Sequence, residues 1–361
     1  MLVKIGLDLG YANITLSNAS ADIYREPSVA IVDKNTRRIL SIGARAALKN
    51  EGEEFENGVM IRPFKNGLLY SSDLTAEIVK NVIDAVKPAE KIRCLIALPS
   101  DFLPKQEAEM FSMLSAAGVS EYFSVKRSVA ALIGAGYSPL ISAISVNIGA
   151  SSTEIAVLHK GEILTSVRES IGGEDFDKAI KQHILEQGDM NVSLLVARTI
   201  KEHLGAVWQG RESESIDIEG TLSLTGSRVK MSISTEDVVG VFEKPLKNLI
   251  LSVANVVKKI PIEYVNEIFE NGVVLTGGGA ELYGLDTMMS KVLGISVTKP
   301  HNAIDSVAKG LSRIHNFLPS KKKLTGKNIT SQIAKFYENA HSKQDTNTSA
   351  SSDDDVKFDI N

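Results

Sequence analysis

The chain has 361 residues, 43% of them hydrophobic, and its formal net charge is −4. This length predicts two domains or one large bilobed unit, and the apolar fraction is sufficient for sizeable cores. Because the net charge is small, the chain has no overall basic field that would attract nucleic acid or an anionic membrane. We therefore expect no direct binding to nucleic acid.

Cys94 is the single cysteine, which excludes a disulfide within the chain and is typical of a reducing compartment. It lies in the mostly apolar residues 92–98, so we interpret it as a core residue. The N-terminus has no basic region followed by a long apolar segment, and no run of about twenty apolar residues occurs. The sequence therefore predicts a cytoplasmic protein.

Residues 4–16 predict two apolar strands joined by a tight turn that contains Asp8, Gly10 and Asn13. A carboxylate at the end of a strand suits a metal ion, and glycine lets backbone amides approach a phosphate closely. The side chain of Asn13 can donate a hydrogen bond to the same group. A simple hairpin turn is the alternative interpretation when this stretch is taken alone.

Further along the chain, strand patterns alternate with helix patterns, which favours an α/β fold with a largely buried sheet. We expect strands at residues 94–98 and 122–125, and helices at residues 73–86, 105–117 and 128–136. The polar residues 33–66 predict a small inserted subdomain.

Residues 144–157 repeat the design of residues 4–16, from apolar strand through glycine and small-residue turn to apolar strand. Two such hairpins, each beginning a lobe, predict a pair of related domains that face one another across a cleft. After them we expect a strand at 162–167, helices at 175–187 and 194–207, and strands at 216–224 and 229–233. A capping signature at 234–237 predicts one long helix towards residue 260.

Three adjacent glycines, Gly277, Gly278 and Gly279, follow a predicted strand at residues 272–276 and precede a predicted helix. Such a run is unfavourable unless something must approach the backbone closely. A helix N-terminus beyond a glycine loop favours anions, so a nucleotide is the expected ligand. A flexible turn between strand and helix is the alternative.

From residue 320 the composition becomes polar, and the apolar spacing in residues 329–340 predicts a short amphipathic helix. We expect disorder from about residue 343. The acidic end, residues 353–361, contains regularly spaced apolar side chains and resembles a short motif that docks on a protein partner. A solubilising tail is the alternative.

The two hairpins, the small-residue helix and the triple glycine occur in the order seen in the actin, sugar-kinase and heat-shock-chaperone superfamily. Within it the chain resembles bacterial actin-like proteins of the MreB type over residues 2–317. The resemblance is carried by residues 26–30, 61–67, 131–136, 172–177, 275–285 and 307–310. It implies an actin-like bilobed α/β fold, with two related ribonuclease-H-like domains around a nucleotide cleft.

The resemblance also implies where the domains begin and end. Lobe I would comprise residues 1–145 with a small subdomain at about 33–66, and lobe II residues 146–302 with a small subdomain at about 182–240. Residues 303–319 would form a helix that returns to lobe I, and residues 320–361 a mostly disordered tail.

As cofactors the resemblance implies ATP and Mg²⁺, with Asp8 matching the acid that holds the magnesium, generally through water. The nucleotide-binding positions that it implies are Asp8, Gly10, Tyr11, Asn13, Asn147, Gly149, Ala150, Ser151, Ser152, Lys201, Glu202, Gly277, Gly278 and Gly279. Among these, Lys201 and Glu202 resemble the pair that brackets adenine and ribose, and a solvated helix face explains this pair equally well.

Two departures from the family pattern concern hydrolysis. Asn147 replaces the acid of the second phosphate loop, and an amide carries no charge for a metal ion. Arg127 aligns with the acid that positions the attacking water, and an arginine cannot orient water as a carboxylate does. We therefore expect bound ATP with slow or absent hydrolysis. The alternative is a site that no longer binds nucleotide.

By this resemblance the chain is expected to form cytoskeletal filaments with itself, for cell shape or for positioning an organelle or DNA. Neither membrane anchor of MreB proteins is visible, since the expected apolar loop falls on the short polar residues 87–91. One alternative is a nucleotide-binding adaptor that does not polymerise. Another is a small-molecule kinase of the same superfamily, which would need a carboxylate base where Asn147 and Arg127 stand.

Overall fold

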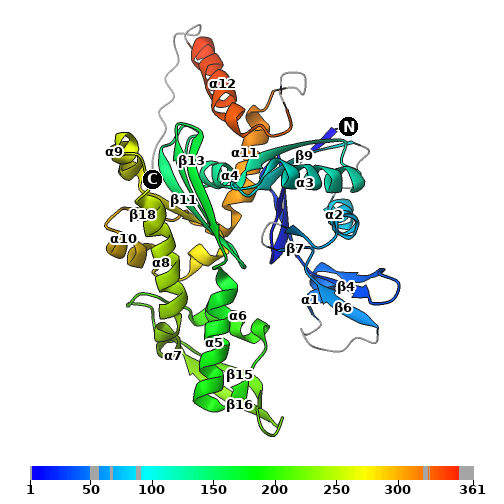
Figure 1. Cartoon of the computed structure of the whole chain (residues 1–361), viewed down its shortest axis with the longest axis vertical. Helices are drawn as coiled ribbons and strands as arrows, with labels where there is room; N and C mark the ends of the chain where they lie inside the picture. The colour runs from blue at the N-terminus through cyan, green and yellow to red at the C-terminus, as the bar shows by residue number, and fades with distance from the viewer. Residues whose placement is uncertain are drawn as a thin grey trace.

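The computed structural model describes residues 2–48, 57–65, 68–86, 91–319, 324 and 326–348. This part of the chain holds two five-stranded sheets, with strand orders β10-β9-β1-β2-β3 and β13-β12-β11-β17-β18. Each is accompanied by a smaller three-stranded sheet, of order β5-β4-β6 or β14-β15-β16. We call the part built on the first large sheet lobe I and the part built on the second lobe II; they lie side by side in Figure 1.

Lobe I is formed mainly by the first third of the chain. Its large sheet comprises β1 (Leu2–Leu9), β2 (Asn13–Asn18), β3 (Ile23–Pro27), β9 (Lys91–Leu98) and β10 (Glu121–Lys126). Its smaller sheets comprise β4 (Ala30–Asp33), β5 (Ile39–Ile42) and β6 (Gly58–Ile61), and the pair β7 (Phe64–Lys65) and β8 (Leu68–Leu69). Its helices are α1 (Gly43–Ala47), α2 (Ser72–Val86), α3 (Pro104–Ala116) and α4 (Arg127–Gly134).

Lobe II follows directly after α4. Its large sheet comprises β11 (Ala143–Ile148), β12 (Thr153–His159), β13 (Glu162–Glu169), β17 (Val273–Thr276) and β18 (Val297–Thr298). Its smaller sheet comprises β14 (Met190–Asn191), β15 (Ser215–Leu222) and β16 (Arg228–Ser234). Its α-helices are α5 (Gly173–Gly188), α6 (Leu194–Leu204), α7 (Thr235–Val239), α8 (Glu243–Val257), α9 (Val265–Asn271) and α10 (Leu285–Leu293). Its 3₁₀ turns are η1 (Gly240–Phe242), η2 (Ile262–Tyr264), η3 (Gly278–Glu281) and η4 (Ala303–Asp305).

The two lobes use the same arrangement around their central strands. β1 pairs antiparallel with β2 and parallel with β9, and β11 pairs antiparallel with β12 and parallel with β17. Both central strands are therefore covered on both edges, which suits their apolar sequences. The two hairpins at residues 4–16 and 144–157 occupy equivalent places, as their repeated pattern predicts.

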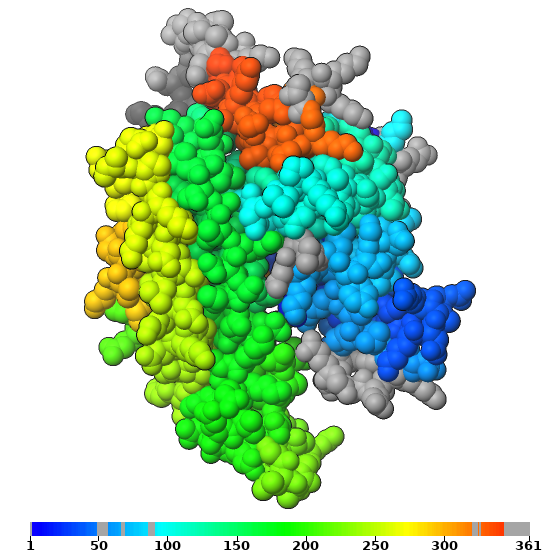
Figure 2. Space-filling model, viewed as in Figure 1, coloured from blue at the N-terminus to red at the C-terminus, as the bar shows by residue number. Residues whose placement is uncertain are grey.

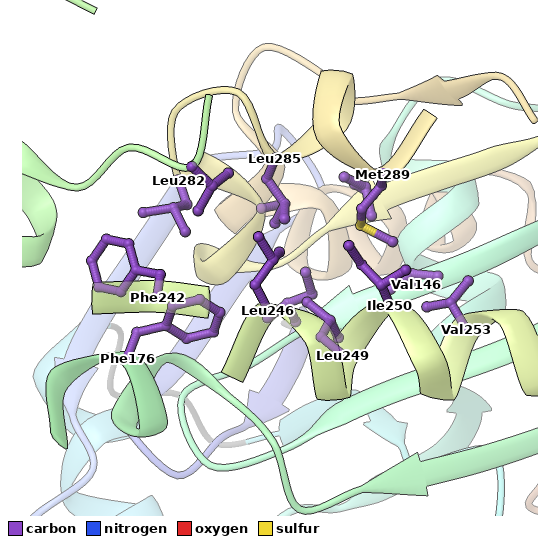
Figure 3. Close-up of a cluster of buried hydrophobic side chains, with 14 of the residues drawn as sticks. Val146, Phe176, Phe242, Leu246, Leu249, Ile250, Val253, Leu282, Leu285 and Met289 are labelled. Carbon is purple, nitrogen blue, oxygen red and sulfur yellow. The ribbon is translucent and has the colours of Figure 1, made fainter. Parts of the chain in front are cut away.

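The core of lobe II lies between its sheet and the long helix α8, whose inward side chains appear in Figure 3. Leu249 and Val253 of α8 are fully buried in it, and the rings of Phe176 and Phe242 pack at a centroid distance of 5.4 Å. Because Phe176 belongs to the first turns of α5, this packing fixes the start of α5 against η1.

α11 (Ser306–Phe317) comes after lobe II and packs on α4 and β1 of lobe I. The helices α4 and α11 touch backbone to backbone, because Gly134 and Gly310 have no side chains at the crossing. A Cβ on Gly310 would lie 1.8 Å from the carbonyl oxygen of Ala130.

The domain boundaries that the sequence predicts for the two lobes stay predictions.

The C-terminal segment covers the free edge of β10. The amide of Ser124 donates to the carbonyl of Lys327 at 2.8 Å, and the amide of Ile329 donates to the carbonyl of Ser124 at 3.0 Å. Ile329 and Ile333 are buried, and the chain continues through η6 (Thr330–Gln332) into α12 (Ile333–Thr348). Figure 2 shows this segment, in orange, lying over the top of the molecule.

Four expectations about the elements are corrected. Disorder from about residue 343 is wrong as far as Thr348, because α12 continues to that residue. The long helix from residue 234 is divided by η1, where Gly240 weakens the helix. The helix expected at 194–207 ends at Leu204, because Gly205 is extended with ψ 120°. The triple glycine leads into a 3₁₀ turn, and α10 begins later, at Leu285.

Residues 349–361, with the expected docking motif at 353–361, lie outside the described residues. None of the described helices is long and apolar enough to cross a membrane.

Candidate functional site

Asp8 and Asn147 occupy equivalent positions in the two lobes. Each is the last residue but one of its central strand, β1 or β11. Each is followed by a turn that the backbone closes in the same way. The amide of Gly10 donates to the carbonyl of Asn13 at 3.0 Å, and the amide of Gly149 donates to the carbonyl of Ser152 at 2.9 Å. These are the two turns in which the sequence predicts phosphate binding.

Arg127, the first residue of α4, forms an ion pair with Asp8. Its Nε and Nη2 lie 3.2 and 3.0 Å from Oδ1 of Asp8, and Nη2 lies 3.4 Å from the carbonyl oxygen of Leu9. Burial alone would lower the pKa of Arg127, but the nearby carboxylates of Asp8 and Glu154 outweigh it and raise the pKa above its ordinary value. The guanidinium is therefore charged at every physiological pH.

Glu154 is an acid of this site that is not among the positions predicted from the sequence. It is only 4% exposed, and it lies opposite Asn147 in the β11–β12 pairing. Its Oε1 accepts hydrogen bonds from the amide of Ser100, at 3.2 Å, and from the Ser100 hydroxyl. Its Oε2 lies 4.0 Å from Nη1 of Arg127 and has no hydrogen-bond partner among the described residues. Burial raises the pKa of Glu154, and Arg127 and Ser100 oppose that rise.

The signal that could have identified Glu154 is an acid inside the apolar strand at residues 153–158. Such a residue is rarely buried without a partner. Its partners, Ser100 and Arg127, come from lobe I, so their identity depends on how the lobes meet.

The side chain of Asn147 is buried and bonded within its own sheet. Its Nδ2 donates to Oγ1 of Thr276 at 2.9 Å, and the two residues are neighbours in the parallel pairing of β11 with β17. This bond explains why an amide is stable at this position. A contact between Asn147 and a phosphate stays a prediction.

The triple glycine packs directly against the end of β11. A Cβ on Gly277 would lie 2.4 Å from the carbonyl oxygen of Ile148, and one on Gly279 would lie 2.2 Å from Cγ2 of the same residue. Gly277 also has a φ of 83°. The close neighbour of these two glycines is therefore Ile148. A Cβ on Gly278 would make only an ordinary contact, at 3.5 Å from Ile304, so packing does not require glycine there.

Lys201 joins helix α6 to the start of α5. Its Nζ lies 2.6 Å from Oδ1 of the buried Asp177 and 2.9 Å from the carbonyl oxygen of Gly173. Burial raises the pKa of Asp177, and the charge of Lys201 opposes that rise. Glu202 is exposed. A structural role therefore explains Lys201, and contact of this pair with a nucleotide stays a prediction.

Three polar contacts join lobe I to lobe II close to the two turns. The hydroxyl of Tyr11 donates to Oε1 of Glu174, the second residue of α5, at 3.5 Å. Ser100 bonds to Glu154 as described above, and Arg168 of β13 lies 3.1 Å from Oδ2 of Asp101. The guanidinium of Arg62 lies 4.6 Å from the centre of the Tyr11 ring. The first turn is therefore held against both lobes.

The residues around Asp8 fit a divalent cation poorly. The described residues contain no group of three or more His, Cys, Asp or Glu side chains that could hold a metal ion. Oδ1 of Asp8 is already bonded to Arg127. The positive charge of Arg127 beside this carboxylate offsets the attraction of Asp8 for a divalent cation.

Comparisons with known proteins identify relatives along most of the chain. The model of the MreB/Mbl protein family matches residues 2–323. The chain is 29% identical over 313 residues to the cell shape-determining protein Mbl of Bacillus cereus, covering 85% of this chain and 93% of that protein. It is 26% identical over 319 residues to the cell shape-determining protein MreB of Escherichia coli, covering 85% of this chain and 91% of that protein.

Two solved structures resemble the whole arrangement of the lobes. MreB5 of Spiroplasma citri bound to ADP has a TM-score of 0.81 at 20% identity, covering 87% of this chain and 96% of that chain. The MamK double helical filament has a TM-score of 0.74 at 21% identity, covering 88% of this chain and 100% of that chain. The predicted actin-like α/β fold is therefore confirmed.

Proposed function

Because the chain belongs to the MreB/Mbl protein family, we propose that it is a cytoskeletal protein that binds ATP between its lobes and assembles into filaments. The observation that carries this proposal is the pair of equivalent turns at Gly10 and Gly149, closed by the same hydrogen bond at the ends of the two central strands. Backbone amides in such turns are suited to phosphates.

Solved structures of similar proteins support both nucleotide binding and self-assembly. MreB5 of Spiroplasma citri has been crystallised with ADP and with AMPPNP, and MamK forms a double helical filament. In our proposal ATP contacts both turns and so favours the conformation in which the lobes are closed and able to polymerise. We place this filament in the cytoplasm.

Hydrolysis of the bound ATP is proposed to be slow or absent. Arg127 stands where the family resemblance places the acid that orients water, and its guanidinium can only donate hydrogen bonds. Glu154 also lies beside Arg127, but its Oε1 accepts hydrogen bonds from Ser100 and its Oε2 faces the guanidinium at 4.0 Å.

The Mg²⁺ ion implied by the resemblance is not part of this proposal, because Arg127 occupies Oδ1 of Asp8. The cellular task that we favour is the maintenance of cell shape, since Mbl and MreB relatives carry that name. Positioning of an organelle or DNA is the alternative. A partner that binds residues 353–361 stays a proposal from the sequence.

Sedimentation of the purified full chain with and without ATP tests the proposal. We expect ATP to move the protein into the pellet, and electron microscopy to show filaments there. Ser151→Asp places a negative charge in the second turn and should weaken ATP binding by about tenfold or more. Ser20→Asp makes the same change on an exposed turn of lobe I and should behave as the unmodified chain.

Binding of ATP without any pelleting would indicate the non-polymerising adaptor instead. ATP consumption that depends on an added small molecule would indicate the kinase. Absence of ATP binding would contradict the proposal outright.

A further inference from the structure

Arg127 lies between two carboxylates that belong to different lobes. On one side Nε and Nη2 donate to Oδ1 of Asp8 in β1, at 3.2 and 3.0 Å. On the other side Nη1 lies 4.0 Å from Oε2 of Glu154 in β12. Only 13% of the Arg127 side chain is exposed, so its charge acts mainly on groups between the lobes.

Both carboxylates adjoin the turns that we assign to the phosphates. Asp8 lies two residues before Gly10 in the first turn, and Glu154 lies two residues after Ser152 in the second. The guanidinium is therefore placed beside both turns at once. A fixed positive charge at this point is suited to a polyphosphate that contacts the two turns together.

The guanidinium also retains donors that are not used by the protein. Nη1 is beyond hydrogen-bond distance from Glu154, and it donates no hydrogen bond to any described residue. An arginine can donate in two directions within one plane, so Asp8 and a phosphate can be bound together. At 4.0 Å from Nη1, Oε2 of Glu154 does not accept a hydrogen bond from this donor.

We infer that Arg127 supplies the positive charge that a divalent cation would otherwise supply, so that this chain binds ATP without Mg²⁺. The inference rests on the proposed function, since it concerns the same site. The poor fit of the donor set around Asp8 to a divalent cation points in the same direction.

The test compares the affinity for ATP in excess Mg²⁺ with that in EDTA, measured by isothermal titration calorimetry on the full chain. We expect the two dissociation constants to agree within about threefold. This ratio corresponds to a smaller free energy than one charge-assisted hydrogen bond contributes. Arg127→Gln should weaken binding in EDTA by about tenfold or more, and Mg²⁺ should restore part of the loss.

Arg168→Gln is the matched control, because it removes a guanidinium that also joins the lobes, through Asp101, but does not contact Asp8. In this variant the ratio of the two dissociation constants should stay as in the unmodified chain. Circular dichroism would show whether each variant is folded. The comparison of Mg²⁺ with EDTA in the unmodified chain remains decisive if Arg127→Gln does not fold.

Loss of ATP binding by the unmodified chain in EDTA would overturn the inference and leave the proposed function standing. Equal binding by Arg127→Gln in Mg²⁺ and in EDTA would overturn the assignment to Arg127. Failure to bind ATP under both conditions would contradict the proposed function itself.

Discussion

Gly134 of α4 approaches Ser306 of α11 so closely that a Cβ on Gly134 would lie 1.6 Å from the carbonyl oxygen of Ser306. The two helices can cross at this distance only because no side chain intervenes. α4 carries Arg127 at its first position, so the crossing also fixes where the guanidinium stands relative to Asp8. A buried contact in the core thus determines the geometry of the site.

Gly134→Ala should destabilise the protein strongly, because the new methyl group would overlap backbone atoms of α11 that cannot move independently. We expect a loss of about 3 kcal/mol or more in the free energy of unfolding, measured with urea. The matched control is Gly240→Ala, where nothing in the described structure lies within 4 Å of the added Cβ and the backbone is helical. That change should be neutral or slightly stabilising. Equal losses in both variants would refute the packing argument.

Removal of Arg127 should destabilise the fold as well as the nucleotide complex. Arg127→Leu leaves the buried carboxylate of Glu154 without its counter-charge, and we expect a loss of about 2–4 kcal/mol. Adding Glu154→Gln removes that charge and should recover part of the loss, so the double-mutant cycle should show coupling between the two positions. Additive effects of the two substitutions would contradict a direct interaction.

The buried His315 predicts that stability falls as the pH is lowered. Burial lowers its pKa to about 4, and its Nε2 donates to the carbonyl oxygen of Ile5 at 2.8 Å. An unfolded histidine has a pKa of about 6.5, so between these values the unfolded chain binds more protons and the folded state loses about 3 kcal/mol on acidification. The loss begins below about pH 6.5 and is complete near pH 4.

Urea unfolding at pH 7 and at pH 4.5 would measure this dependence. His315→Gln keeps a donor towards Ile5 but has no titrating group, so the part of the pH dependence that belongs to His315 should disappear. Carboxylate groups titrate in both proteins and cancel in the comparison. An identical pH profile for the variant would show that His315 is not responsible.

The C-terminal segment should contribute to stability through its two buried anchors. Ile329→Ala removes a side chain that is 0% exposed, and we expect a loss of about 2–4 kcal/mol in the free energy of unfolding. Leu224→Ala, at a position that is 91% exposed, should change it by less than about 0.5 kcal/mol. If Ile329→Ala were as mild as Leu224→Ala, residues 327–333 would not be packed on lobe I in solution.

Release of phosphate from ATP should be slow or undetectable in pelleted filaments. The reason is that Arg127 cannot orient water, while Glu154 is bonded to Ser100 through Oε1 and faces the guanidinium with Oε2. The measurement should be made beside Mbl of Bacillus cereus and MreB of Escherichia coli under identical conditions. ATP turnover equal to that of either relative would contradict the proposal that this site hydrolyses ATP slowly or not at all.

The sequence was sufficient for those features that depend on local pattern. The apolar runs on either side of Gly10 and Gly149 predict two strand pairs joined by tight turns, and both turns are closed by the same hydrogen bond. The repeat also predicts that Asp8 and Asn147 occupy equivalent positions. Here the short-range arrangement of glycine and apolar residues determines the structure directly.

Features that depend on contacts between distant segments could not be predicted. Glu154 belongs to the site because Ser100 and Arg127 of lobe I lie beside it. The triple glycine predicts the close approach of a ligand, which stays a prediction, and the structure adds a second reason for glycine at 277 and 279, the approach of Ile148. The local spacing of the chain does not show which distant residues contact Glu154 or the glycines.

In our proposal a nucleotide held between the two turns accompanies filament formation. Electron cryo-microscopy of the full chain with ATP would show whether it does. We expect filaments whose subunits contain a nucleotide with its phosphates against the turns at Gly10 and Gly149. Filaments that form equally well without nucleotide and contain none between the lobes would contradict it.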